Sequence, residues 1–154
     1  MKAAVSGAAF LLLLLAAVRA GAACNVTATS VNFGAYDVFS SVPLDSTGSV
    51  SVSCDEVPPP DPVVMIGPSG TSGGYYPRMM RRSSGSGTLE YNLFTDSSMT
   101  AVWGDGTAGT SIVQLKNVKR QKPPVVTTIY GRIPAGQNVP SGAYADTLTV
   151  TITW

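Results

Sequence analysis

The last eight residues, Thr147-Leu148-Thr149-Val150-Thr151-Ile152-Thr153-Trp154, alternate strictly between threonine and a large apolar side chain. Successive side chains of a β-strand point to opposite faces, so the pattern predicts a strand with one apolar face and one threonine face. Neither Lys nor Pro interrupts the segment to discourage a further strand from pairing with it. Two interpretations stay open: a central strand paired on both sides, or an edge strand that accepts another strand. The apolar face consists of Leu148, Val150, Ile152 and Trp154.

The same alternation recurs along the rest of the chain. Residues 49–54 and 89–93 alternate between polar and apolar side chains, 63–66 form a continuous apolar run, and 125–133 are β-branched and aromatic. Gly, Pro, Ser and Asp clusters separate these runs, and no window shows apolar residues repeating at helical spacing. Six or seven short strands with such punctuation predict an all-β fold, a single β-sandwich domain.

The composition excludes several classes of function. The chain has 154 residues, no His, two Cys and 12% charged residues, against a globular average of ~25%. Without His there is no His-based acid–base catalysis, no Ser–His or Cys–His nucleophile pair and no His metal site. Two cysteines cannot form a four-cysteine zinc site, and a net charge of +1 provides no basic footprint for nucleic acid. We therefore expect no enzyme, no cofactor and no nucleic-acid partner.

The N-terminus reads as a secretory signal peptide. Lys2 precedes the apolar run 8–15, and small residues at 20–23 lead to Cys24. The apolar run is too short to span a membrane, and Arg19 interrupts its far end. We assign residues 1–23 to the signal and 24–154 to the mature domain, with cleavage after Ala23 or Ala22. A lipoprotein signal, with Cys24 as the lipidated residue, is the alternative.

Export decides how the two cysteines are interpreted. In an oxidising compartment a chain with two cysteines is expected to hold one disulfide, here between Cys24 and Cys54. Two free thiols are the alternative.

An aromatic and basic stretch between Gly- and Ser-rich segments has two interpretations. Aromatic residues, Met and Arg are enriched at interface cores, so the stretch would suit a surface-contact loop. The simpler interpretation is a strand whose Tyr and Met side chains enter the core while Arg stays outside. The candidate contact residues are Tyr75, Tyr76, Met79, Met80, Arg81 and Arg82.

Three other polar features receive structural interpretations. A basic cluster before Pro123 would suit an anionic polysaccharide or lipid head group, but a solvated loop is the simpler reading. Residues 103–106 supply too few oxygen ligands for calcium and are expected to form a turn with a packed Trp103. Scattered carboxylates show no catalytic pairing. The basic cluster is Lys116, Lys119, Arg120 and Lys122, and the carboxylates are Asp37, Asp45, Asp55, Glu56 and Asp61.

Segments spread over nearly the whole mature chain carry a family resemblance by their order and spacing. They are CNV (24–26), VNFGAYD (31–37), GSVSVSC (48–54), RMM (78–80), LEYNLFTD (89–96), VWGDG (102–106), YGRIPAGQ (130–137) and GAYADTLTV (142–150). In this the chain resembles the spore coat protein U domain family, which also occurs in subunits of archaic chaperone–usher pili.

The resemblance implies an immunoglobulin-like sandwich that lacks its final strand. Subunits similar to this one are filled first by a strand from a periplasmic chaperone, and an outer-membrane usher then exchanges it for the N-terminal extension of the next subunit. The groove would be bordered by Leu148, Val150, Ile152 and Trp154, and the chaperone would anchor the carboxylate of Trp154. The partners implied are the chaperone, the usher and other pilus or coat subunits, with secretion through the periplasm to the cell surface.

One departure from the family pattern concerns the donor segment. Fibre-forming subunits carry alternating apolar residues before the first cysteine, whereas cleavage near Cys24 leaves almost nothing to donate. This favours a terminal, tip or non-polymerising role. The alternative is a self-sufficient adhesin or carbohydrate-binding sandwich that uses the stretch from Tyr75 to Arg82.

Overall fold

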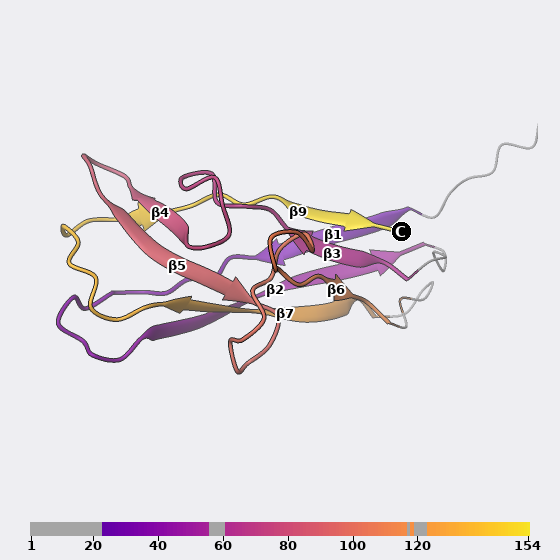
Figure 1. The fold of residues 1–154 in the computed structure, drawn as a ribbon. Helices are drawn as coiled ribbons and strands as arrows, with labels where there is room; N and C mark the ends of the chain where they lie inside the picture. The colour runs from indigo at the N-terminus through magenta and orange to yellow at the C-terminus, as the bar shows by residue number, and fades with distance from the viewer. Residues whose placement is uncertain (1–22, 56–60, 117, 119–122) are drawn as a thin grey trace, which may run out of the picture.

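The computed structural model describes residues 23–55, 61–116, 118 and 123–154, and in these residues the chain is all-β (Figure 1). The signal segment expected at the N-terminus lies outside the described residues, apart from Ala23. The strands are β1 (Cys24–Thr29), β2 (Leu44–Cys54), β3 (Val63–Ile66), β4 (Arg78–Arg82), β5 (Thr88–Phe94), β6 (Val113–Gln114), β7 (Val125–Ile133), β8 (Tyr144–Ala145) and β9 (Val150–Thr153). Within these residues no helix is long and apolar enough to cross a membrane.

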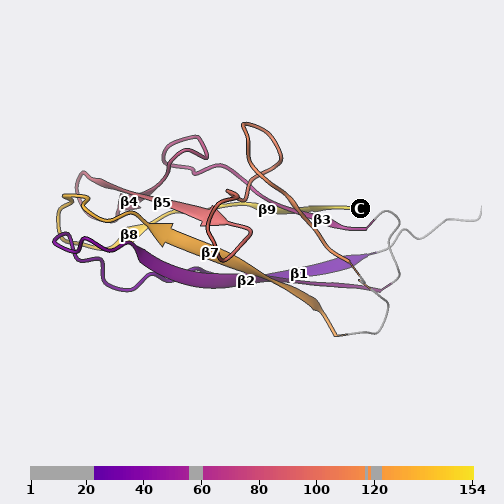
Figure 2. The ribbon, with the colours of Figure 1, turned by 60° about the horizontal axis from the view of Figure 1, so that its bottom comes forward.

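The strands form two sheets that enclose one core. The larger sheet has the order β1-β2-β7-β5-β4-β8 and the smaller one the order β6-β3-β9, with every pair of neighbours antiparallel. The smaller sheet lies over the end of the larger one that holds β1, β2 and β7 (Figure 2). The sequence-based prediction of an all-β sandwich is confirmed. Two of the nine strands have only two residues, which explains why periodicity alone suggested fewer.

The core consists of the apolar faces of the alternating segments. Val50 and Val52 in β2 and Val64 in β3 are fully buried. Their neighbours along each strand, which are Ser in β2 and Val63 and Met65 in β3, point to the opposite face and are half-buried. Trp103 is also fully buried and its indole Nε1 donates to the Val64 carbonyl oxygen at 3.1 Å. The expected turn with a packed Trp103 is therefore confirmed, and the indole fastens the 102–111 segment to the smaller sheet.

The last strand is shorter than the alternation predicts. Only Val150–Thr153 forms a ladder, with β3, whereas Tyr144–Ala145 pairs with β4 in the other sheet. The chain thus changes sheets between residues 146 and 149. Along this change Gly67, directly after β3, donates its main-chain N–H to the Thr149 oxygen at 2.8 Å. A continuous apolar-polar pattern cannot reveal such a change, because the side chains alternate in the same way on either sheet.

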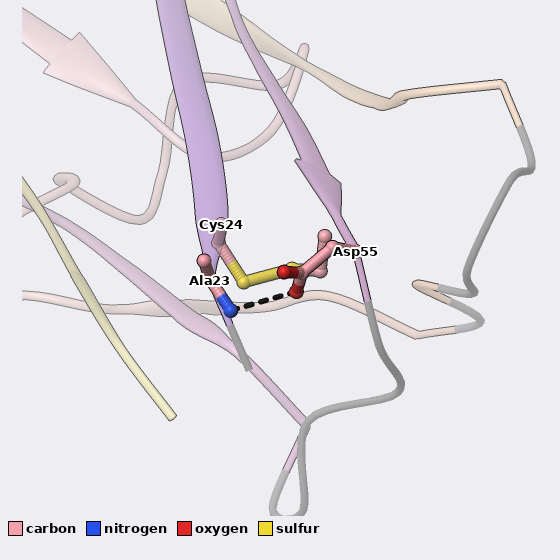
Figure 3. The surroundings of a disulfide bond; sticks show 4 residues. Ala23, Cys24 and Asp55 are labelled. Carbon is pink, nitrogen blue, oxygen red and sulfur yellow. Dashed lines mark hydrogen bonds between the residues drawn. A yellow bond between two sulfur atoms is a disulfide. The ribbon is translucent and has the colours of Figure 1, made fainter. Parts of the chain in front are cut away.

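A disulfide joins the first two strands. Cys24 and Cys54 are directly opposite in the β1–β2 ladder, with 4.0 Å between their Cα atoms and 2.05 Å between their sulfur atoms (Figure 3). The predicted Cys24–Cys54 bond is confirmed, and Cys24 is held in a disulfide rather than left as a free thiol.

Removing this disulfide is expected to destabilise the domain. The bond spans 30 residues of sequence, and closing a loop of that size contributes about 3–4 kcal/mol in the chain-entropy model. Replacing both cysteines with Ser should lower the free energy of unfolding by that amount in a urea titration. The same change in a chain already treated with reductant serves as control, since there the substitution should cost little. A double variant as stable as the oxidised protein would contradict the expectation.

Candidate functional site

An open groove lies between the segment around the end of β1 and the segment that leads into β9. One cavity of about 850 Å³ and another of about 370 Å³ lie between the segment 28–39 and the segment 139–150. Five residues line both cavities, so the two adjoin and form one groove. The shared residues are Ser30, Val31, Phe33, Met80 and Tyr144.

On one side of the groove, β9 presents an unpaired main-chain edge. β9 pairs with β3 and with no other strand among the described residues. Because Thr149 accepts the bond from Gly67, the register makes Thr149, Thr151 and Thr153 the residues that bond to β3. The N–H and C=O groups of Val150 and Ile152 therefore point away from β3, toward the open side.

On the other side, β1 presents a second edge that no strand in the described part of the chain pairs with. Asp55 N donates to the Ala23 oxygen, and Cys24 and Cys54 form the next, closely spaced pair, so Val26 and Ala28 direct their main-chain groups away from β2. The side chain of Val26 lies on the same face as the buried Val52, yet it is 39% exposed. The inward face of β1 is therefore uncovered.

The topology also determines how a further strand would fit. The two strands that border the groove, β1 and β9, run in opposite directions (Figure 1). A strand inserted between the edges is parallel to one of them and antiparallel to the other in either orientation. The groove therefore offers nearly equivalent main-chain pairing to a strand of either direction.

The lining of the groove is mainly apolar. Asp37 and Asp146 are the formally charged side chains among the described residues that line it. Asp146 accepts a hydrogen bond from the Tyr91 hydroxyl at 2.8 Å. Burial first, and then this bond and the negative charge of Asp146, raise the pKa of Tyr91 above its ordinary value. Tyr91 therefore stays neutral, and the groove is suited to apolar side chains.

A buried arginine holds the strands behind the groove in place. Arg78 is fully buried, and its guanidinium donates to the main-chain oxygens of Ile66, Gly67 and Trp103 at 3.3, 3.0 and 2.7 Å. It also donates to Asn92 Oδ1 at 2.8 Å. Burial lowers the pKa of Arg78 from its ordinary value, but Arg remains protonated in proteins. The cation therefore joins the end of β3, the partner of β9, to β4 and β5.

The four residues expected to border the groove lie in different places. Leu148 and Val150 line the smaller cavity and are half-buried. Ile152 is half-buried against the core, and Trp154 is 45% exposed beyond the end of β9. Neither Ile152 nor Trp154 lines the two cavities. Residues 30–39 line much of the groove, and the sequence reasoning did not assign them to it. Their only signal was the VNFGAYD motif of the resemblance.

The surface-contact loop expected around Tyr75 is wrong for two of its residues. Tyr75 is 8% and Met80 9% exposed, so neither is available to a partner. Tyr76 is 56% exposed and Arg81 is exposed, while Met79 and Arg82 are half-buried. The alternative, a strand with Arg outside, is also wrong at Arg78. The alternation of β4 places Arg78 and Met80 on the same inward face.

The polar clusters behave as solvated surface where they are described. Lys116 contacts Asp61 at 3.0 Å, Arg132 contacts Asp45 at 2.7 Å, and both pairs are exposed. The described residues hold no group of three or more metal-ligating side chains. Lys119, Arg120, Lys122 and Glu56 lie outside the described residues.

The fold and the groove define a class: a disulfide-linked β-sandwich with two open strand edges. The model of the Spore Coat Protein U domain matches residues 10–151, and this chain belongs to that family. The family assignment made from the sequence motifs is confirmed.

Two relatives accompany the family match. Protein U of Myxococcus xanthus is 36% identical over 148 residues, covering 87% of this chain and 79% of that protein. A chain in the crystal structure of the CsuC–CsuE chaperone–tip adhesion subunit pre-assembly complex, from archaic chaperone–usher Csu pili of Acinetobacter baumannii, has a TM-score of 0.51 at 20% identity. That match covers 86% of this chain and 40% of the solved chain. At this identity the likeness supports the fold.

Proposed function

We propose that this protein is a secreted structural subunit of a surface appendage or coat-like layer, and that its groove accepts an extended strand from a partner. The observation that carries the proposal is the pair of unpaired main-chain edges, β1 and β9, on either side of an apolar groove. Strand addition uses main-chain hydrogen bonds for affinity and alternate side chains for specificity. The groove offers an inserted strand both free main-chain groups and apolar surface. Such a strand would cover Val26, Leu148 and Val150.

The partners follow from the relatives. One solved structure of similar fold belongs to a complex described as a chaperone with a tip adhesion subunit before assembly. By analogy, a periplasmic chaperone fills the groove first, and an outer-membrane usher then passes the subunit to its neighbour. The two strand orientations that the groove permits suit such an exchange, because the outgoing and incoming strands need not run in the same direction.

The place of the subunit in the assembly follows from its N-terminus. If the signal is removed beside Cys24, no apolar segment precedes β1 that a neighbouring subunit would accept. The protein then receives a strand but donates none, which gives it a terminal or non-polymerising role. The function is structural, and it requires no catalytic group.

Co-expression tests this proposal directly. The precursor is exported alone, or together with a candidate periplasmic chaperone, and the products are compared by size exclusion and intact mass without reductant. We expect a soluble 1:1 complex and aggregation or degradation of the lone chain. A stable monomer that unfolds cooperatively without a partner would overturn the proposal and favour a self-sufficient binding module.

A further inference from the structure

One acidic side chain interrupts the apolar row that leads into β9. From Tyr144 to Thr153 the even-numbered side chains are half-buried and the odd-numbered ones exposed, without a break at the change of sheets. Leu148 and Val150 of this row line the smaller cavity, and so does Asp146. Asp146 is the only charged side chain among the described residues that line this cavity. The edge that would lie beside an added strand therefore carries one negative charge.

Two hydrogen bonds hold the Asp146 carboxylate in place. Its Oδ2 atom accepts from the Tyr91 hydroxyl at 2.8 Å, and its Oδ1 atom accepts from the Thr147 main-chain N–H at 3.0 Å. Tyr91 is 5% exposed and belongs to β5, so the carboxylate is positioned by the sheet behind the groove. An ionised carboxylate can accept about four hydrogen bonds. About half of its capacity therefore remains for a partner.

In the described part of the chain, no cation forms an ion pair with Asp146. The two ion pairs there are Lys116 with Asp61 and Arg132 with Asp45. The buried Arg78 donates instead to three main-chain oxygens and to the Asn92 side chain. The charge of the half-buried Asp146 is therefore left to solvent. An added strand would displace that solvent, and covering an ionised carboxylate without a partner is costly.

We propose that Asp146 selects a partner strand that carries a Lys or Arg side chain at the position beside it. This inference rests on the proposed acceptance of a strand by the groove. Side chains directly opposite each other on neighbouring strands lie on the same face, and opposite charges there attract. Because Asp146 precedes Val150 by four residues, the basic residue lies four positions from the residue that faces Val150, toward β8.

The carboxylate gives the groove a basis for specificity that its apolar lining lacks. A wholly apolar strand would bury Asp146 unpaired, and a strand with an acidic residue at this position would add repulsion. A basic residue supplies a charge-assisted hydrogen bond, which is stronger than a neutral one. Asp146 therefore acts against unsuitable strands as well as in favour of the suitable one.

A strand joined to the chain itself tests the proposal. The precursor is extended after Trp154 by a Gly-Ser linker and a segment of about nine residues that alternates Val with Thr. The exported, disulfide-bonded product is unfolded in urea. In a series of variants, Lys replaces each Val of the segment in turn. We expect Lys to lower the stability at every position except the one beside Asp146.

Asp146→Asn provides the decisive comparison, since Asn keeps an acceptor for the Tyr91 hydroxyl but carries no charge. With Lys beside position 146, this substitution should lower the equilibrium constant for folding by about 10-fold. With Val at that position, the substitution should raise the constant, because it removes an unpaired carboxylate. Asp37→Asn is the matched control: Asp37 lines the larger cavity only, so its replacement should affect the Lys and Val segments equally.

The outcomes separate this inference from the function on which it rests. A Val–Thr segment that adds no stability over the linker alone would contradict strand acceptance, and the selection by Asp146 with it. A segment that stabilises the chain, but in which no Lys position responds to Asp146→Asn, would overturn the selection and leave strand acceptance intact. Gln in place of the favoured Lys should lose most of the gain. Equal stability with Gln would show that the groove does not recognise the charge.

Discussion

Replacing Val150 with Asp is expected to weaken the binding of a partner strand by about 100-fold, equivalent to about 3 kcal/mol. The side chain of Val150 is half-buried and lines the groove, so an added strand would cover the new carboxylate. Burying an unpaired charge is costly, and the nearby charged lining residue, Asp146, is also negative. The measurement is the dissociation constant of the complex with the co-expressed chaperone.

The neighbouring residue provides the matched control. Thr151→Asp adds the same charge one position along the strand, but the Thr151 side chain is exposed on the opposite face. We expect this variant to bind within a few-fold of the native protein. Equal losses in both variants would assign the effect to charge at the strand edge rather than to the groove. Unchanged binding in Val150→Asp would show that the strand does not enter here. Circular dichroism and non-reducing mass confirm that both variants are folded and oxidised.

Replacing Arg78 with Met is expected to lower the free energy of unfolding by about 3–5 kcal/mol, because it leaves several buried acceptors without a donor. The guanidinium satisfies three main-chain oxygens and Asn92 Oδ1, and an unmet buried acceptor costs about 1–3 kcal/mol. Met fills the space of the alkyl chain but donates nothing. Because typical domains are stable by only about 5–15 kcal/mol, the variant should lose a large part of its stability. Urea unfolding followed by the fluorescence of the buried Trp103 measures the change.

Arg81→Met is the control for this variant. Arg81 lies on the same strand and is exposed, so its replacement should change stability by no more than about 0.5 kcal/mol. All variants are compared in the same form, free or partner-bound. A loss at Arg78 no larger than that at Arg81 would show that the buried cation is not needed to join β3 to β4 and β5.

Alternation in the sequence predicted which residues face inward but not which strands lie side by side. Val50, Val52 and Leu89 were placed correctly because a strand exposes its side chains alternately, whatever its neighbours are. Arg78 was placed on the outside because a charged side chain is normally excluded from a core. Its burial depends on three carbonyl oxygens, those of Ile66 and Gly67 at the end of β3 and that of Trp103, which lie 11 to 25 residues away in sequence. No local pattern records such distant acceptors.

The family resemblance predicted a groove, but the strands and residues that border it were known only from the tertiary structure. The pattern of residues 147–154 identifies an apolar face, but it leaves open whether the strand is central or at an edge. Tertiary structure shows β9 at an edge of the smaller sheet and β1 at an edge of the larger one, and it adds residues 30–39 as lining. Those residues form the irregular connection between β1 and β2, and their place depends on packing rather than on periodicity.

By itself the sequence determined the all-β class, the inward faces of the main strands, the Cys24–Cys54 pairing and the family, since each depends on residue type, local spacing or motif order. Tertiary structure alone decided that the two free edges lie on opposite sides of one groove, that Arg78 closes the core behind it, and that Asp146 contacts Tyr91 within it. These features depend on contacts between segments distant in the chain. Their positions are determined by strand order and register, which a period of two leaves undefined.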